Sequence, residues 1–168
     1  GSEMCIRDRA IWAAPDFNDA AWKSMKVPGL MQEQDLPGFS GLVWFRKTID
    51  IPAGWAGKDL ILNLGVIDDN DFTYFNGIQI GHTEGWMAPR SYKIPKELVK
   101  KGKAVIAVRV MDTGGTGGIN GSPESISLHL SDTEAIQLAG NWKYQVSLDM
   151  REVAPMPFDM SWNPNSPT

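Results

Sequence analysis

The stretch that decides the fold is DFTYFNGIQI, residues 71–80. Asn76 and Gly77 stand at its centre, with apolar β-forming residues on both sides. An Asn-Gly pair in this setting favours a two-residue type I′ β-hairpin, because both turn positions need a positive φ. We therefore predict that Asp71–Phe75 and Ile78–Ile80 are paired antiparallel strands.

Alternation of apolar and polar residues extends this β pattern along the chain in both directions. The period of two runs through Leu42–Ile51, Leu60–Leu64, Ile126–Leu130 and Trp142–Leu148, and it marks half-buried strands. The first of these segments has two faces: Val43, Phe45, Ile49 and Ile51 on one, and Trp44, Arg46, Thr48 and Asp50 on the other. Ala104–Met111 is apolar on both faces except at Arg109, as expected of a central strand that is covered on both sides.

Little helix is predicted. Pro95–Gly102 favours one or two helical turns, with Pro in the first turn and Gly as the stop signal, and Asp16–Trp22 favours a short turn. A fold of alternating strands and helices is therefore excluded. Several short strands joined by Gly/Pro/Asp-rich loops predict an all-β protein, an antiparallel β-sandwich or barrel, with prominent loops at Gly81–Ser91 and Asp112–Ser122.

Composition and charge exclude several classes of partner. The 168 residues suit one domain with a single hydrophobic core. Apolar runs fall short of the ~20 residues that cross a bilayer. The net charge is −4, and the short basic run at 96–103 is diluted by Glu97, so no patch suits a nucleic acid. Cys5 is the only cysteine, which excludes an internal disulfide. We expect neither a membrane nor a nucleic acid as partner.

The pattern divides the chain into three parts. Residues 1–9 fit nothing downstream and are expected to be a foreign leader. Residues 10–150 carry the β pattern and form the body of the module. Residues 151–168 include four prolines and no alternation, so we expect a linker that leads into, or packs on, a further domain.

A catalytic apparatus is not evident in the sequence. There is no Gly-x-Ser-x-Gly elbow, and the glycine-rich run at 112–118 lacks the Lys-Ser/Thr and the helix of a phosphate-binding loop. We interpret His129 as a solvated histidine on the polar face of a strand, and His82 as a loop residue with a ligand contact as the alternative. We expect no catalytic residue and no cofactor.

Asp68, Asp69 and Asp71 form an acidic cluster directly after a predicted strand. Paired carboxylates serve glycosidases, and a hard cation such as Ca²⁺ binds clustered carboxylates, although this spacing is not that of an EF-hand. Like charges so close together repel and normally mark a polar loop, which is the interpretation we favour. A structural calcium site is the alternative.

Aromatic and planar polar residues supply candidates for carbohydrate recognition, because a tryptophan ring can stack on the apolar face of a sugar. Trp44 lies opposite the predicted core face of its strand, so we expect it on an open sheet surface. Trp86 lies in the predicted loop, with Arg90 and Tyr92 close behind. These three residues form either a sugar platform or an anchor for the loop.

A longer series of motifs resembles the sugar-binding, galactose-binding-like jelly-roll domain of family 2 glycoside hydrolases. The motifs span about residues 10–130, in this order: Trp44-Phe45-Arg46-Lys47, Ile51-Pro52, Gly57-Lys58, Leu64–Asp71, Asn76-Gly77, Gly81, Trp86, Arg90-Ser91-Tyr92, Ile94-Pro95, Gly102-Lys103 and Val105–Asp112. The resemblance implies a jelly-roll β-sandwich. It also implies that Asp68, Asp69 and Asp112 contact sugar hydroxyls, and that Arg90 and Tyr92 either contact the sugar or anchor their loop.

The C-terminal part is similar to the module inserted in bacterial sialate O-acetylesterases, within a hydrolase domain of the SGNH type. The residues that carry this similarity are the loop at 114–121, Leu138–Tyr144 and the tail Asn163–Thr168. The catalytic serine and histidine motifs of that family have no counterpart in this chain. By resemblance, the chain is an accessory module of a periplasmic or secreted carbohydrate esterase.

Three functions are weighed on these observations. The first is a non-catalytic carbohydrate-binding module whose partners are an oligo- or polysaccharide and a parent esterase domain. The second is a structural insert that positions or oligomerises the parent through an apolar patch, which would involve Trp142 or the proline-rich tail. The third, catalysis by the acidic cluster itself, is disfavoured because no base–nucleophile pair is discernible. We favour carbohydrate binding.

Overall fold

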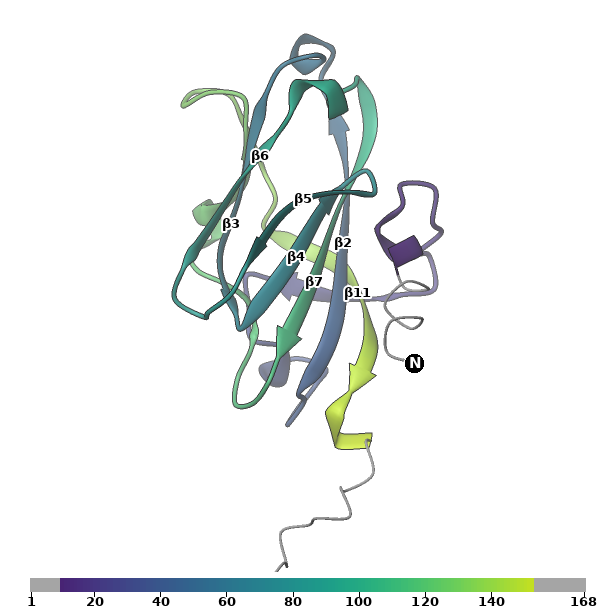
Figure 1. The fold of residues 1–168 in the computed structure, drawn as a ribbon, viewed down its shortest axis with the longest axis vertical. Helices are drawn as coiled ribbons and strands as arrows, with labels where there is room; N and C mark the ends of the chain where they lie inside the picture. Colours follow the sequence, from purple (N-terminus) through teal and green to yellow (C-terminus); the bar gives the residue numbers. More distant parts are fainter. Residues whose placement is uncertain (1–9, 153–168) are drawn as a thin grey trace, which may run out of the picture.

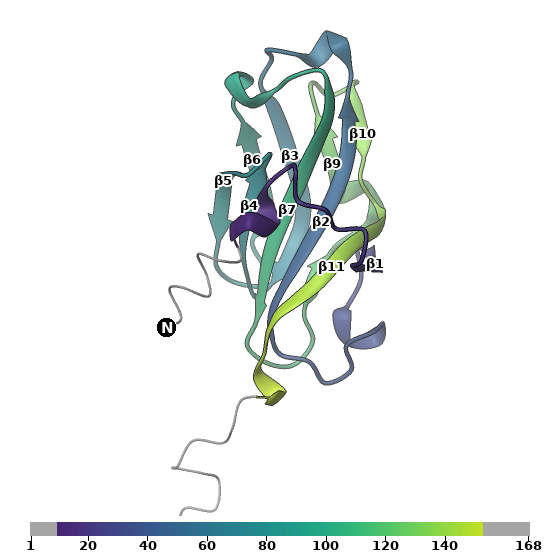
Figure 2. The same ribbon diagram turned by 90° about the vertical axis from the view of Figure 1, so that its right-hand side faces the viewer.

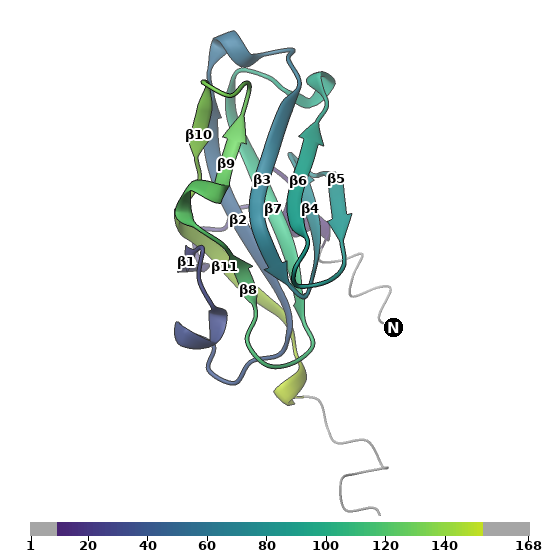
Figure 3. The same ribbon diagram turned by 90° about the vertical axis from the view of Figure 1, so that its left-hand side faces the viewer.

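The chain forms two antiparallel β-sheets that pack face to face, as seen in a computed structural model that describes residues 10–152 (Figure 1). The six-stranded sheet has the order β1 (Lys23–Val27), β11 (Gly140–Asp149), β2 (Gly41–Ile51), β7 (Gly102–Asp112), β4 (Asn70–Phe75) and β5 (Ile78–Thr83). The five-stranded sheet has the order β10 (Ala135–Gln137), β9 (Ile126–His129), β3 (Leu60–Asp68) and β6 (Pro89–Ile94), with β8 (Gly118–Asn120) also paired to β3 (Figure 3). The predicted all-β sandwich is confirmed.

Short 3₁₀ turns join these strands. They are η1 (Ala10–Ala13), η2 (Met31–Glu33), η3 (Ala53–Trp55), η4 (Lys96–Leu98), η5 (Pro123–Ser125) and η6 (Met150–Glu152). The helix predicted at 95–102 is reduced to the three residues of η4, and Gly102, its predicted stop, begins β7. Within residues 10–152, no helix is long and apolar enough to cross a membrane. The predicted leader and nearly all of the predicted linker lie outside this range.

The hairpin at Asn76-Gly77 has the expected geometry. The φ angles of Asn76 and Gly77 are 48° and 84°, and Phe75 pairs directly with Ile78 across the turn. The strand on the other side of β4 is β7, which lies in the middle of its sheet between β2 and β4, as its apolar sequence predicts. β4 and β5, the two strands of this hairpin, therefore lie at one edge of the six-stranded sheet.

Between the sheets lies the main core, formed by alternate residues of the long strands. Leu60, Leu62 and Leu64 of β3 are fully buried, and so are the inward residues of β7, Ile106, Val108 and Val110. Strands with a period of two present one apolar row each, so two facing sheets enclose both rows. The last strand departs from this rule: a register shift in β11 between Val146 and Leu148 pairs Leu148 with Leu42, and Leu148 is exposed.

A second, smaller core covers the outer face of the six-stranded sheet. The N-terminal segment crosses this face (Figure 2) and packs Trp12, Phe17 and Trp22 against Trp44 and Ala107. Only 1% of the Trp44 surface remains exposed. The prediction that Trp44 lies on an open sheet surface was therefore wrong, because the alternation pattern shows which face a residue takes but not what later covers that face.

Two segments that were predicted as loops contain strands. Gly81–Ser91 supplies the end of β5 and the start of β6, and Asp112–Ser122 contains β8. Neither segment has the apolar alternation of a half-buried strand, since β5 lies at a sheet edge and β8 is three residues long. The loop between β5 and β6 is thus confined to the few residues around Trp86.

Candidate functional site

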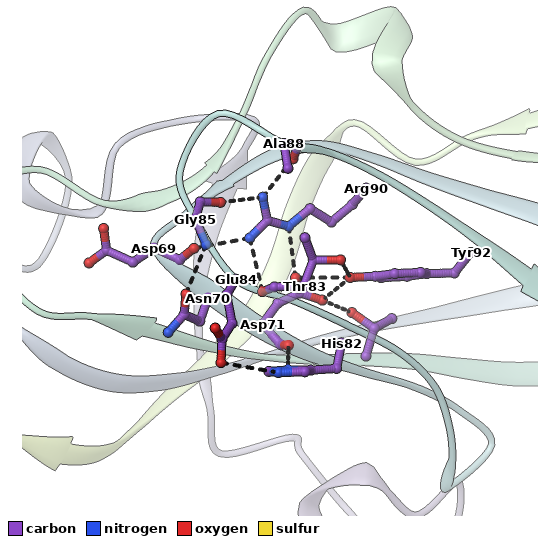
Figure 4. Close-up of polar contacts among 11 residues, drawn as sticks. Asp69, Asn70, Asp71, His82, Thr83, Glu84, Gly85, Ala88, Arg90 and Tyr92 are labelled. Atoms are coloured by element: carbon purple, nitrogen blue, oxygen red, sulfur yellow. Dashed lines mark hydrogen bonds and ion pairs between the residues drawn. The ribbon is translucent and has the colours of Figure 1, made fainter.

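A buried polar cluster joins the two sheets beside the β5–β6 loop (Figure 4). Asp71 of β4 and Arg90 of β6 are both almost fully buried, and Arg90 Nε donates to Asp71 Oδ1 at 2.8 Å. The Asp71 carboxylate also accepts from the hydroxyls of Tyr92, at 2.8 Å to Oδ2, and Thr73, at 2.7 Å. Four side chains from two strands, β4 and β6, thus form one buried cluster around this ion pair.

Arg90 uses all of its N–H donors in this cluster. Its two terminal nitrogens donate to the carbonyl oxygens of Gly85 (2.7 Å), Ala88 (2.6 Å), Asp69 (3.0 Å) and Thr83 (3.2 Å). With the bond to Asp71, the five donors of a guanidinium are accounted for. Arg90 therefore anchors the β5–β6 loop and has no donor left for a sugar.

The position of Arg90 and Tyr92 corrects the predicted sugar platform. Both residues lie on strand β6 and point into the sandwich, with alternate burial along the strand. Burial, together with the neighbouring Asp71 carboxylate, raises the pKa of the Tyr92 phenol, so the hydroxyl remains a donor. Of the three residues grouped in the sequence, the structure leaves only Trp86 in the loop, with 60% of its surface exposed.

Three carboxyl groups lie at the end of the sandwich where β3 and β7 terminate. Asp69 Oδ2 accepts from both the N–H and the hydroxyl of Thr113, each at 2.8 Å. Asp112 is fully buried, and its carboxylate accepts from Gln32 Nε2 at 2.6 Å and from the Gly114 N–H at 3.1 Å. These two acids hold the glycine-rich loop in place. Asp112 is thus not exposed to a sugar, contrary to what its place in the resemblance implies.

Asp68 differs from its two neighbours. Burial, its hydrogen bond to the Asp69 carboxyl and the nearby acidic charges raise the pKa of Asp68 to about 7, whereas the same hydrogen bond lowers the pKa of Asp69. The two groups therefore share a proton below neutral pH. Within residues 10–152, the Asp68 carboxyl group accepts no hydrogen bond from a backbone N–H or an amide side chain.

This raised pKa predicts a pH-dependent stability. Between the unfolded pKa near 4 and the folded pKa of about 7, the folded chain holds more protons than the unfolded chain, so the free energy of unfolding falls as the pH rises through this window. The lowered pKa of Asp69 changes the free energy of unfolding only at pH values below this window. We expect Asp68→Asn to reduce this fall, measured by urea unfolding from pH 4 to pH 8, while the raised pKa of the buried Asp112 carboxyl keeps the remainder.

The matched control for this pH series is Asp132→Asn, which changes an exposed acid in the turn before β10. In this control, the free energy of unfolding should fall with rising pH as it does in the unmodified chain. Parallel curves for Asp68→Asn and the unmodified chain would contradict the shared proton.

Two contacts tie the β5–β6 loop to the acidic turn, which is the turn that carries Asp68 and Asp69. Gly85 N–H donates to Asn70 Oδ1 at 3.0 Å, and Arg90 binds the Asp69 carbonyl (Figure 4). The loop that carries Trp86 and the turn that carries Asp68 and Asp69 are therefore braced against each other. The structure brings these three predicted site residues to one end of the sandwich.

No protein-family model matches the chain. About half of it resembles part of a known enzyme. Structures of β-glucuronidase from Ruminococcus gnavus, including one in complex with D-glucuronic acid, share 25% identity over 52% of this chain and 16% of theirs, with a TM-score of 0.49. The chain thus spans 16% of the length of that enzyme.

A calcium site at Asp68, Asp69 and Asp71, the alternative for the acidic cluster, depends on where the Asp71 carboxylate points. Its carboxylate is enclosed by Arg90, Tyr92 and Thr73, so the three acids at 68, 69 and 71 do not converge on one point. Among the residues that the structure describes, no group of three or more acidic, histidine or cysteine side chains is arranged to hold a metal ion.

The two histidines also differ from their predicted settings. His82 lies on β5, where its ring stacks on Phe72 with centroids 4.1 Å apart, and its Nδ1 contacts the Asp71 carbonyl oxygen at 2.9 Å. His129 is half-buried, and its Nε2 lies 2.6 Å from the hydroxyl of the buried Ser127. No carboxylate is bonded to this Ser–His pair within the described part of the chain, so the orienting acid of a hydrolase triad is missing there.

Sequence reasoning missed two groups of residues around this end. Gln32 lies 80 residues from Asp112, and no local pattern could connect them, although its amide bonds both Asp112 and the Gly117 N–H. The second group lines a shallow pocket of about 170 Å³ on the outer sheet face beside the acidic turn: Asn70, Phe72, His82, Glu84, Arg109 and Met111. Its one signal in the sequence was Arg109, the single polar residue in an apolar strand.

Proposed function

We propose that this chain is a non-catalytic carbohydrate-binding module that holds a glycan beside the catalytic domain of a hydrolase, in a parent protein of the sialate O-acetylesterase kind. The observation that carries the proposal is an exposed Trp86 on a loop that is braced against a turn of carboxyl groups. A loop held in this way presents the Trp86 ring from an ordered backbone, which lowers the entropic cost of binding a sugar.

The braced turn supplies the polar half of such a site. Sugar hydroxyls need planar acceptors close to the ring on which the sugar stacks, and a carboxylate accepts up to four hydrogen bonds. Asp69 and Asp112 are engaged with Thr113, Gln32 and the glycine-rich loop. We assign Asp68 as the acid that contacts the glycan, with Asp69 and Asp112 as supports.

The partners follow from the same proposal. They are an oligo- or polysaccharide and the parent esterase domain, in the periplasm or outside the cell. A loop-end site of this kind suits the end of a glycan chain, because the loop and the turn enclose a small region, whereas an open sheet face would suit a continuous polymer.

Replacing Trp86 with alanine tests the proposal. We expect the affinity for a glycan to fall at least about 10-fold, which corresponds to about 1.4 kcal/mol, because the stacking surface is lost. Calorimetric titration with sialosides, glucans, mannans and xylans measures this effect. Trp86→Phe should retain part of the affinity, and Met87→Ala, which changes an equally exposed neighbour without a planar ring, should retain all of it.

A second function has one observation in its favour. Leu148 and Met150 are exposed at the end of β11 and in η6, directly before the predicted linker, so an apolar surface is available for a parent domain. Of the two candidates for that surface, Trp142 does not contribute, because it is fully buried and its Nε1 donates to the Leu138 carbonyl oxygen at 2.8 Å. Nearly all of the proline-rich tail lies outside the described residues. If no glycan binds at millimolar concentration, the carbohydrate-binding proposal fails and the structural insert remains.

A further inference from the structure

One row of side chains crosses the outer face of the six-stranded sheet and ends in the pocket beside the acidic turn. The strand register pairs Trp44 with Arg109, Arg109 with Phe72 and Phe72 with His82. The Arg109 guanidinium carbon lies 4.5 Å from the centroid of the Phe72 ring, and the His82 ring stacks on Phe72 at an interplanar angle of 24°. The N-terminal segment covers Trp44, whereas Arg109, Phe72 and His82 line the open pocket.

Arg109 differs from the two other arginines on which the sandwich depends. Arg46 and Arg90 each bind one carboxylate and several carbonyl oxygens. Arg109 is half-buried, yet within residues 10–152 its guanidinium forms no ion pair and no hydrogen bond. It lies over the Phe72 ring, and the nearby Tyr74 stabilises its charge. Burial lowers the pKa of its guanidinium, which shows that the positive charge is incompletely compensated.

The remaining walls of the pocket add a donor and two apolar surfaces. Asn70 Oδ1 accepts from Gly85, which leaves the amide NH₂ of Asn70 for a ligand. Met111 and Phe72 supply the apolar surfaces. The one acid in the described lining, Glu84, is 77% exposed, and its carboxylate lies 3.6 Å from His82 Nε2, so water screens much of its charge. The pocket thus offers the donors of the Arg109 guanidinium and the Asn70 amide, with the exposed Glu84 carboxylate as the one acid among its lining residues.

From this arrangement we propose that the pocket formed by Asn70, Phe72, Arg109 and Met111 binds the carboxylate of an acidic sugar. A planar guanidinium matches a carboxylate with two parallel hydrogen bonds, which places a planar anion ahead of a tetrahedral one. The Asn70 amide donates to a ring substituent, and the apolar walls contact the C–H face of the sugar. That the anion is carried on a sugar rests on the proposed function, whereas the carboxylate follows from the pocket itself.

Titration of the full chain with single sugars tests this site, by calorimetry and by NMR shifts. D-Glucuronate, D-galacturonate and N-acetylneuraminate should bind, with shifts at Phe72, His82 and Arg109, whereas D-glucose should produce no shifts there. Arg109→Met retains the apolar stem above Phe72 and should weaken binding of the acidic sugars at least 10-fold. Arg109→Lys should retain part of the affinity, and Lys103→Met, an exposed cation on the same strand, should retain all of it.

The outcomes separate this site from the proposed function. Trp86→Ala should leave the binding of single acidic sugars unchanged, because the two sites use different residues. If neutral glycans bind and acidic sugars do not, the carboxylate site is overturned and the binding module stands. Equal affinity for inorganic phosphate and for D-glucuronate would also overturn it, since the pocket would then be a general anion site. Circular dichroism confirms that each variant is folded.

Discussion

Arg90→Met is expected to lower the free energy of unfolding by about 3–5 kcal/mol, the usual cost of removing one partner from a buried ion pair. The substitution leaves the Asp71 carboxylate buried without its cation, and it removes the donors to four carbonyl oxygens around the β5–β6 loop. Urea unfolding followed by circular dichroism measures the loss, with the slope of the transition unchanged.

Two further variants isolate the cause of this loss. Lys93→Met changes another cation on β6, but its ion pair with Asp59 is exposed, so we expect little change. The double variant Arg90→Met/Asp71→Leu should recover part of the stability, because it removes the unpaired charge as well. A loss for Arg90→Met no larger than that for Lys93→Met would show that the cluster does not hold the sheets together.

Arg46→Met is expected to release the N-terminal segment from the outer sheet face. Arg46 donates to Asp19 Oδ2 at 2.9 Å and to the carbonyl oxygens of Trp12, Ala14 and Phe17, so one guanidinium binds four groups of that segment. Charged hydrogen bonds of this kind contribute ~1.5–3 kcal/mol each and are not additive, and Asp19 is partly exposed. We expect a loss of about 2–4 kcal/mol.

Fluorescence distinguishes this loss from that of Arg90→Met. Release of the segment would expose the rings of Trp12, Trp22 and Trp44, so the emission of native Arg46→Met should shift to longer wavelength. The segment 10–22 should also become sensitive to protease, because it no longer packs on the sheet. The folded Arg90→Met variant should keep the emission wavelength of the unmodified chain. The folded Lys47→Met variant, which changes the neighbouring cation on β2, should keep it too. An unshifted spectrum for Arg46→Met would contradict the role of Arg46.

The strands that could be predicted are those whose signal is local. Asn76-Gly77 adopts the two positive φ angles that its turn requires, and Leu60, Leu62 and Leu64 face the core, because backbone preference and alternation act within a few residues. Strands such as β1, β8 and β10 are three to five residues long, and they form because a longer strand is available for pairing. Their sequence carries no independent signal.

The sequence named candidate residues but not their neighbours in space. The structure places Asp68, Asp69 and Trp86 at one end of the sandwich, a proximity that no sequence motif indicated. Arg90 differs: its spacing from Trp86 suggested a shared loop, yet the partner that determines its role is Asp71, which lies 19 residues earlier and on the opposite sheet. A buried charge takes its function from the groups that neutralise it, and these come together only when the sheets pack.

By itself, then, the sequence determined an antiparallel all-β fold with its hairpin at Asn76-Gly77, because turn chemistry and a period of two are properties of neighbouring residues. Only the tertiary structure decided which polar and aromatic side chains are available to a ligand. It covered Trp44 with the N-terminal segment, used every donor of Arg90 inside the protein, and left the Arg109 guanidinium without an ion pair among residues 10–152. The physical reason is that exposure and charge compensation depend on what packs over a residue, which can come from any part of the chain.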